Sequence, residues 1–196
     1  PITSEFNQND EKFATDLIQG HSIILKLFEP KNQVGKTKLH ISRVVHGYKN
    51  LFDKSSGFGS SGSCNNDINC TEGDTWQDES DAVAMILVNN NRICSGALVN
   101  NGCQDFSPNF LTAFHCLDAN SNGSLESDEI TQVQNNWVFR FQYKSPSCNG
   151  PDDISFFSFS GSTFRAAWNT SDFALLELNQ RPQGETGIKL AGWNRG

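Results

Sequence analysis

Short apolar runs separated by turn-forming residues dominate the chain beyond residue 59. Each run is six or seven residues long, which is the usual length of a strand and too short for most helices. The runs are "AVAMILV" (82–88), "ICSGALV" (93–99), "FLTAFHC" (110–116), "WVFRFQY" (137–143), "ISFFSF" (154–159), "STFRAAW" (162–168), "FALLEL" (173–178) and "IKLAGW" (188–193). This rhythm predicts an all-β domain, either a small barrel or a sandwich.

The segment "WVFRFQYK" (137–144) alternates between aromatic residues and a more polar set. Successive side chains of a strand point to opposite faces, so the alternation predicts a half-buried strand with its aromatic face inward. One helix is expected, at 125–134, where acidic residues crowd the first turn as the helix dipole favours.

Residues 1–58 form a different segment. Two β-rich runs, 22–28 and 38–48, flank "EPKNQVGKT", whose Pro and Gly indicate a turn. The Gly/Ser run "SSGFGSSGS" (55–63) is typical of a flexible connection. We therefore expect a domain boundary near Gly59, with one unit at 1–58 and another at 59–196.

Charge and hydropathy exclude two classes of partner. The net charge of −7 and the absence of a basic run argue against a nucleic-acid surface, which needs clustered Lys and Arg. No stretch approaches the ~18 apolar residues that cross a bilayer, so no membrane partner is expected.

Six cysteines lie at positions 64, 70, 94, 103, 116 and 148. They form no C-x-x-C pair, so disulfides in an oxidising compartment fit better than a metal framework. Cys94 and Cys116 are candidates for a bridge that would hold the segment around His115 against a neighbouring strand. Six cysteines allow fifteen pairings, so the full connectivity stays open.

His115 and Asp172 are the candidates for catalysis. A single His in an apolar run is more often a hydrogen-bonded core residue, and an Asp before a strand is often a turn residue. Together they indicate another role, because a carboxylate that accepts one imidazole nitrogen leaves the other free to take a proton from a hydroxyl nucleophile.

The motifs "CSGALVN" (94–100), "FLTAFHC" (110–116) and "DFALLEL" (172–178) resemble those of the trypsin-like, chymotrypsin-fold serine endopeptidases. Phe114 departs from the family's usual T-A-A-H-C motif. More narrowly, "GSSGSCNNDINC" (59–70), "SGSTFRAAWNTSDFALLELN" (160–179) and "AGWNRG" (191–196) resemble the bacterial lysyl endopeptidases of that fold.

The resemblance implies that His115 is the general base and Asp172 its orienting acid, in the first barrel of a double β-barrel. No G-D-S-G-G element occurs in the chain, so we expect the serine nucleophile and the second barrel to lie outside these residues. The chain is accordingly interpreted as a fragment of a precursor that cleaves peptide bonds, after Lys if the narrower resemblance holds.

The resemblance also implies two disulfides, Cys70–Cys148 and Cys94–Cys116. Cys64 would pair beyond the chain, and Cys103 has no partner in that scheme, so it either pairs with Cys64 or stays free. Residues 1–58 resemble the tail of a propeptide, through "RVVHGY" (43–48).

Directly after Cys116, "DANSNGSLESDE" (118–129) matches the twelve-residue calcium-loop pattern D-x-[DN]-x-[DN]-G-x5-E. The simpler interpretation is a polar surface insertion with an Asn-Gly turn. The expected ligands of a structural Ca²⁺ are Asp118, Asn120, Asn122, Ser124, Glu126 and Glu129.

Two functions follow from these observations. The first is a secreted bacterial-type serine endopeptidase that requires no cofactor, acts on protein or peptide substrates, contacts its own propeptide and is a monomer. The second is an inactive relative of the same fold that serves as a calcium-dependent binding module. The downstream sequence distinguishes them by the presence or absence of the serine.

Overall fold

The computed structural model describes residues 12–18, 20–46, 64–89, 92–150, 155–182 and 187–194. The expected boundary near Gly59 and the Gly/Ser run 55–63 lie outside the described residues. No helix in the described ranges is long and apolar enough to cross a membrane.

Seven strands make one antiparallel sheet in the order β5-β4-β1-β2-β3-β7-β6. The strands are β1 (Val83–Val88), β2 (Arg92–Val99), β3 (Asn109–Thr112), β4 (Val138–Phe141), β5 (Phe157–Ser160), β6 (Ser162–Trp168) and β7 (Phe173–Leu178). The structure is therefore mostly β, as the rhythm of apolar runs predicts.

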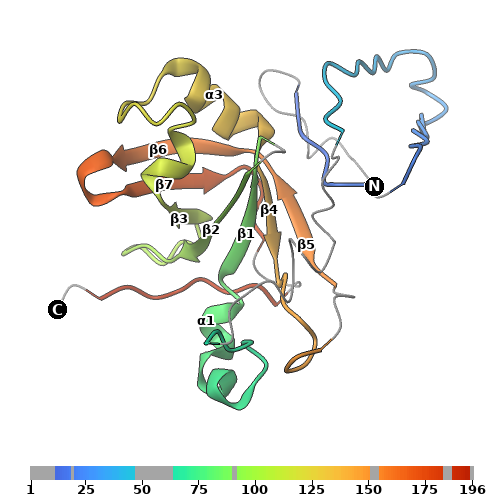
Figure 1. Cartoon of the computed structure of the whole chain (residues 1–196). Coiled ribbons are helices and arrows are strands. Elements are labelled where there is room, and N and C mark those ends of the chain that lie inside the picture. The colour runs from blue at the N-terminus through green and yellow to red at the C-terminus, as the bar shows by residue number, and fades with distance from the viewer. Residues whose placement is uncertain are drawn as a thin grey trace.

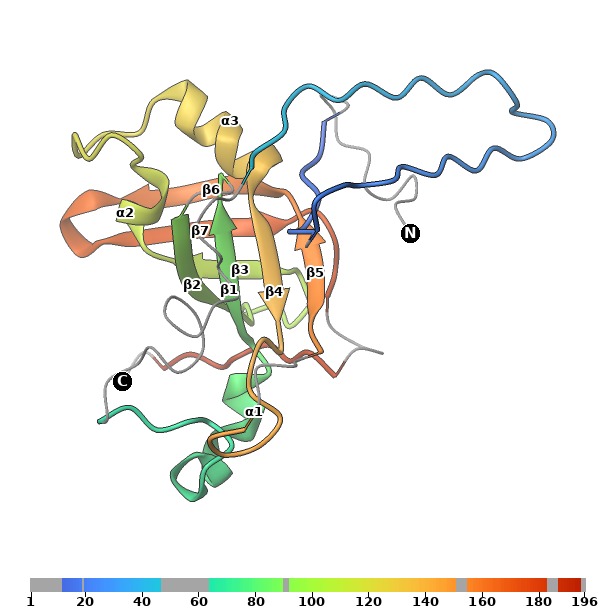
Figure 2. The same ribbon diagram turned by 45° about the vertical axis from the view of Figure 1, so that its right-hand side comes forward.

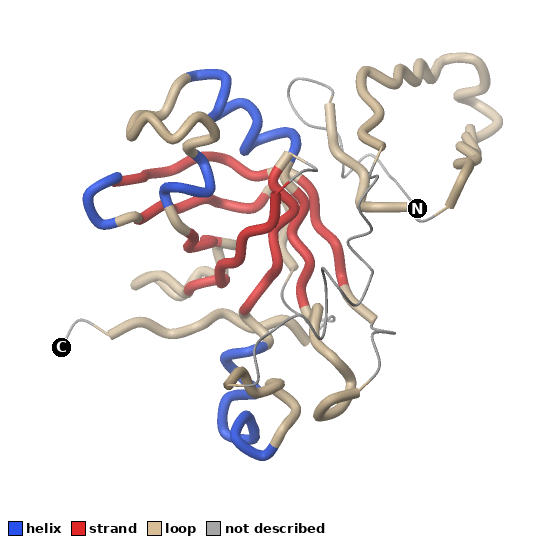
Figure 3. Tube along the Cα trace, viewed as in Figure 1, coloured by secondary structure: helices blue, strands red, loops and turns tan. Residues whose placement is uncertain are grey.

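The sheet curls into a half-barrel (Figures 1 and 3). Its two outermost strands, β5 and β6, are consecutive in the chain and separated by Gly161 alone. Gly161 has a φ of 78°, which favours glycine, and its N–H donates to the carbonyl of Trp137 at 3.0 Å. A flat sheet would hold these two margins far apart, so the single-residue connection requires the curl.

Aromatic rings fill the inside of the curl. Phe110 of β3 lies edge-on to Phe139 and Phe141 of β4, with centroid distances of 5.0 and 6.1 Å. All three are fully buried. Rings of this size bury about 150–250 Å² each and prefer such edge-to-face geometry. Further core residues come from β1, β2 and β7 and from α3 with the residue that follows it: Ile86, Val88, Leu98, Leu176, Leu178, Val133 and Trp137.

Short helices occupy the connections. They are η2 (Thr71–Trp76), α1 (Gln77–Ser80), α2 (Phe114–Leu117), α3 (Ser127–Asn136) and η3 (Asn169–Ser171). The expected helix at 125–134 is α3, and it begins after an extended Glu126. Glu126 and Glu129 form a capping box, in which each side chain accepts the backbone N–H of the other residue.

Three strand predictions need correction. The run 110–116 is not one strand, because β3 ends at Thr112 and residues 114–117 turn into α2. The run 188–193 forms no strand but isolated bridge positions at Ile188 and at Ala191, of which Ala191 pairs with Val99. β4 is buried on both faces rather than half-buried, since Arg140, on the face opposite the aromatic residues, is 1% exposed.

The prediction of strands at 22–28 and 38–48 is wrong for residues 22–28 and 38–46, and 47–48 lie outside the described residues. Turn residues at 31–36 separate two exposed, unpaired stretches. Ile24 is 91% and Phe28 is 84% exposed, so these side chains have no apolar surface to cover them. A strand pair with no buried face is marginal in water, which explains the difference.

Candidate active site

His115 lies in the first turn of α2, immediately after β3 (Figure 2). Ala113 is extended and ends the strand before the helix starts. The hydroxyl of Thr112 donates to the carbonyl of Ser95 at 2.9 Å and fastens the end of β3 to β2. The side chain of His115 is 70% exposed, so it is not the buried core histidine that an apolar run usually contains.

Asp172 lies between η3 and β7 in the left-handed region, with a φ of 49°. Asp and Asn tolerate this conformation better than most residues. β7 pairs with β3, and Ala174 is the register partner of Thr112. Since Asp172 precedes Ala174 by two residues and His115 follows Thr112 by three, the strand pairing places both at the same end of the sheet.

Three hydrogen bonds join Asp172 to the segment that carries His115. Asp172 Oδ2 lies 2.7 Å from His115 Nδ1. Asp172 Oδ1 accepts the backbone N–H of His115 at 2.9 Å, and the Asp172 carbonyl accepts that of Phe114 at 3.2 Å. One residue thus fixes both the ring and the backbone of His115.

The pKa of Asp172 is lowered, chiefly by the backbone N–H of His115 and next by its ring. An ionised carboxylate accepts hydrogen bonds only, so the proton between the two groups belongs to His115 Nδ1. The other ring nitrogen, Nε2, is then the basic one. The pair has the arrangement that general-base catalysis requires.

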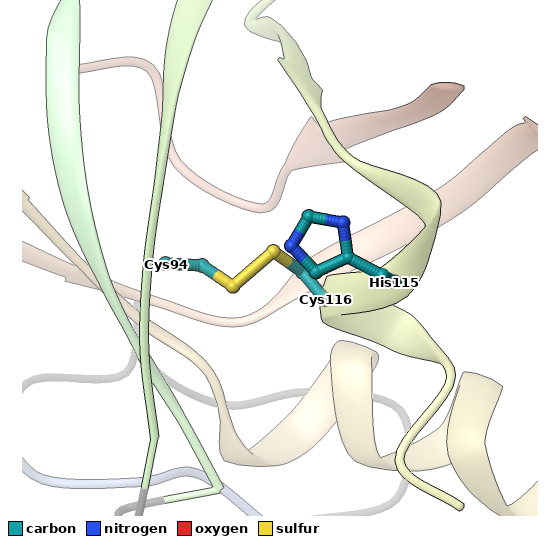
Figure 4. Close-up of side chains that lie close together, drawn as sticks. All are labelled: Cys94, His115 and Cys116. Carbon is teal, nitrogen blue, oxygen red and sulfur yellow. A yellow bond between two sulfur atoms is a disulfide. The ribbon is translucent and has the colours of Figure 1, made fainter. Parts of the chain in front are cut away.

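A disulfide braces the same segment from the other side. Cys94 of β2 and Cys116 of α2 are bonded, with their Cα atoms 6.3 Å apart, and Figure 4 shows the imidazole beside the two sulfurs. The potential ligand atoms of Cys94, His115 and Cys116 lie within 4.8 Å of one another. These sulfurs are oxidised, however, and a metal binds the thiolate, so the group does not make a metal site.

A shallow hollow of about 420 Å³ opens beside the imidazole. Its lining includes Met85, Ile93, Ser95 and Ala113, together with His115 and the disulfide. The hollow places apolar side chains, among them Met85 and Ile93, around the same space as the imidazole.

The second disulfide joins Cys70 to Cys148, with a Cα separation of 4.5 Å. It links the start of η2 to the segment that follows β4. These two bonds are the pairs that the resemblance implies. Cys64 and Cys103 are exposed and unbridged in the structure, so the alternative Cys64–Cys103 bond is not formed.

The loop 118–129 turns its side-chain oxygens toward its own backbone. Asp118 accepts the N–H of Asn122 at 3.1 Å and that of Gly123 at 2.8 Å. Glu129 accepts the N–H of Ala119 at 2.7 Å and that of Glu126 at 3.1 Å. Both carboxylates are about 95% buried. The loop therefore holds two buried carboxyl groups on backbone N–H donors.

The amide side chains complete this loop. Asn120 Oδ1 accepts the N–H of Asn122, Asn122 Oδ1 accepts that of Ser124, and both amide groups donate to the Glu126 carboxylate. The pKa of Glu126 is lowered, chiefly by the hydrogen bond from the Asn122 amide, next by that with Glu129, and less by that from the Asn120 amide. The expected side-chain ligands come from one compact loop, and each of their oxygens that accepts a single hydrogen bond keeps a second lone pair.

Comparison with known proteins shows to which family this chain belongs. A family model described as "Lysyl endopeptidase, C-terminal domain" matches residues 58–196. The chain belongs to the lysyl endopeptidase family. The description names the C-terminal domain, and it names neither a catalytic domain nor a catalytic residue.

A lysyl endopeptidase of Pseudomonas aeruginosa is 27% identical over 199 residues, which cover 93% of this chain. The chain spans about 40% of the length of that relative. The family relation is thus established for residues 58–196 of this chain.

Sequence reasoning missed the contacts between Asp16 and Arg140. Arg140 alternates with aromatic residues, which indicates a solvent-facing strand position, and no motif surrounds Asp16. A buried arginine requires an anion, but sequence alone does not show that Arg140 is buried.

Proposed function

We propose that this chain is part of a serine-type endopeptidase in which His115 is the general base and Asp172 orients it. The observation that carries the proposal is the double contact of Asp172 with the ring and the backbone of His115. The two residues lie 57 apart in the sequence and come from separate strand connections. Their convergence is what the chemistry requires.

In the proposed reaction, Nε2 of His115 takes the proton of a serine hydroxyl while that oxygen attacks the scissile carbonyl. Asp172 keeps the proton on Nδ1 and stabilises the imidazolium that forms. The imidazolium then protonates the leaving amine, and an acyl-enzyme remains. Water then attacks the acyl carbonyl while Nε2 takes its proton, and the imidazolium returns that proton to the serine oxygen as the bond to the acyl group breaks.

We place the nucleophile and the oxyanion-hole donors in a part of the protein outside these 196 residues. The coverage of about 40% of the Pseudomonas relative leaves room for a second barrel there. The half-barrel would then be the first barrel of a chymotrypsin-like enzyme, with residues 1–58 as its propeptide tail. The name of the relative supports cleavage after lysine.

The test uses the complete protein, including the sequence that follows residue 196. A fluorophosphonate probe, which reacts only with an activated serine, is expected to label it. His115→Ala should abolish labelling, and His40→Ala, which removes an exposed histidine from the N-terminal segment, should not. Absence of labelling in the wild-type protein would favour the binding-module alternative.

We also propose that loop 118–129 binds Ca²⁺ through Asp118, Asn120, Asn122, Ser124, Glu126 and Glu129. Oxygen donors are the ligands this cation prefers, and the three carboxylates would be partly neutralised by it. Ca²⁺ would brace the segment that leaves His115 and would take no part in the reaction.

The two disulfides, together with a bacterial relative, support secretion into an oxidising environment. Peptide substrates and the chain's own propeptide are the proposed partners, and the protein is proposed to be monomeric. Nucleic acid and membranes are not proposed partners, because the net charge is −7 and the chain has no basic run.

A further inference from the structure

Arg140 of β4 and Asp16 of the N-terminal segment are in contact, although they lie 124 residues apart. Arg140 Nε donates to Asp16 Oδ1 at 2.9 Å and to Oδ2 at 3.2 Å, and Nη2 also donates to Oδ1. Two guanidinium nitrogens therefore hold one carboxylate, which is the strongest geometry that arginine offers an anion.

Ser158 of β5 supplies a third donor to the same carboxylate, from its hydroxyl to Asp16 Oδ2. Ser158 is the register partner of Arg140 in the β4–β5 ladder. Directly opposed residues point to the same face of a sheet. The donors are thus a cross-strand pair on the face opposite Phe139 and Phe141, and they are presented by the sheet itself.

The surroundings of Arg140 make this contact costly to lose. Its side chain is 1% exposed, whereas that of Asp16 is 23% exposed. The guanidinium lies 4.5 Å from the centroid of the Phe156 ring and 5.5 Å from that of Tyr143. Aromatic faces stabilise a cation but do not replace an anion, so a guanidinium buried this deeply needs a carboxylate.

We propose that Arg140 and Ser158 form a carboxylate-binding site on the outer face of β4 and β5, and that residues 12–18 occupy it through Asp16. The ligand class is an acidic residue in an unpaired peptide segment. Asp16 Oδ1 also accepts the N–H of Leu17 at 2.7 Å, so the segment presents its carboxylate in a fixed local geometry. Figure 2 shows the N-terminal segment beside β5.

The contact of Asp16 with Arg140 and Ser158 needs no covalent connection between the two segments. It also does not require that His115 be catalytic, so this proposal and the proposed function can fail separately. The N-terminal segment should therefore stay on the half-barrel after the chain between them is cut. An acidic peptide added in trans would compete for the same donors.

The experiment uses the full chain with a recognition sequence for a specific protease inserted in the Gly/Ser run 55–63 and a tag at the N-terminus. The protein is folded intact and then cut, and dissociation of the tagged segment from the immobilised half-barrel is measured. Wild-type segment should be retained. Asp16→Asn should raise its dissociation constant at least about tenfold, since breaking a buried charged pair weakens association strongly.

Glu29→Gln is the matched control. It also removes a carboxylate from the N-terminal segment, but Glu29 accepts the N–H groups of Gly35 and Thr37 inside its own turn. Retention should be unchanged. Equal retention of the Asp16→Asn and wild-type segments, or loss of the wild-type segment on cutting, would overturn the proposal.

Ser158→Ala tests the site from the barrel side and leaves Arg140 in place. It should weaken retention severalfold, and combining it with Asp16→Asn should add little, because both changes remove the same contact. Additive effects of the two substitutions would contradict a shared site. Hydrogen exchange on the uncut Asp16→Asn chain should show faster exchange at residues 12–18 while β1 and β2 stay protected.

Discussion

The carboxylate of Asp172 accepts two hydrogen bonds from His115, one from ring Nδ1 at 2.7 Å and one from the backbone N–H at 2.9 Å. The ring bond selects the tautomer of the imidazole, and the backbone bond ties Asp172 to the first turn of α2 and so positions the Cα of His115. An acid whose side chain contacted the ring alone would leave the N–H of Phe114 as the one backbone donor of α2 bonded to residue 172.

Asp172→Asn should lower kcat/KM of the complete protein by a factor on the order of 10³ to 10⁴, because an amide opposite Nδ1 no longer selects the productive tautomer. Peptide hydrolysis under steady-state conditions measures the effect. Asp74→Asn, at an exposed position in η2, is the control and should leave kcat/KM unchanged. A loss of less than tenfold at Asp172 would argue against its proposed role.

His115→Ala should raise the pKa of Asp172 only part of the way toward its ordinary value of 3.8, because the substitution keeps the backbone N–H that is the main cause of the lowering. NMR titration of the carboxyl carbons measures this. Asp105, whose pKa is lowered to about 2 chiefly by Ser107, should titrate unchanged.

The sign of the linked stability effect follows. A carboxylate with a lowered folded-state pKa stabilises the fold above 3.8 and loses that contribution as the pH falls through the folded-state value. The stability difference between wild-type and His115→Ala that arises through Asp172 should therefore be present at neutral pH and shrink below 3.8.

Cys94→Ser combined with Cys116→Ser should lower the free energy of unfolding by about 3 kcal/mol, the loop-closure estimate for a bridge of this span. Cys94 and Cys116 are 22 residues apart. Chemical denaturation gives the value. Cys103→Ser, at an exposed unbridged position, should change stability by less than about 0.5 kcal/mol.

Gly96→Ala should destabilise the half-barrel by about 1–3 kcal/mol, as overpacking does. A Cβ at Gly96 would lie 2.4 Å from the Leu111 carbonyl oxygen and 2.4 Å from an edge carbon of Phe110, so β2 or the ring must move. Gly102→Ala meets nothing within 4 Å and serves as the control. Equal thermal midpoints for the two variants would show that β2 tolerates the methyl group.

Millimolar Ca²⁺ should raise the thermal midpoint of the chain, and a chelator should reverse the shift, because a ligand of the folded state stabilises it. Glu129→Gln should remove the response. Asp128→Asn changes the neighbouring carboxylate, which is exposed and is not an expected ligand, and should preserve it. An identical midpoint with and without Ca²⁺ in the wild-type chain would eliminate the proposed site.

Local periodicity was sufficient to predict five of the strands. The runs around Val83, Ile93, Phe139, Phe164 and Leu176 carry enough β-branched and aromatic residues for propensity and tertiary structure to agree. The candidate pair of His115 and Asp172 could also be predicted, because a carboxylate that orients an imidazole is a known catalytic arrangement and both residues lie in motifs that resemble those of serine endopeptidases.

Tertiary contacts decided the rest. His115 lies in a helical turn because Asp172 accepts the N–H of residue 115 and its carbonyl accepts that of residue 114, and no local pattern signals those bonds. Arg140 has the spacing of a solvent-facing residue, yet Asp16 covers it from 124 positions away. Exposed apolar residues near Phe28 match strand propensity but find no partner in the described part of the chain.

The corner at Gly161 has a consequence for folding. β5 and β6 are the two outermost strands of the sheet, and one residue joins them. A register shift of two residues between β5 and β4 would therefore also displace β6 relative to β7. Mispairing would have to break hydrogen bonds to β4 and β7 simultaneously. The alignment of the β4–β5 ladder therefore constrains that of the β6–β7 ladder, although the two ladders lie at opposite ends of the strand order.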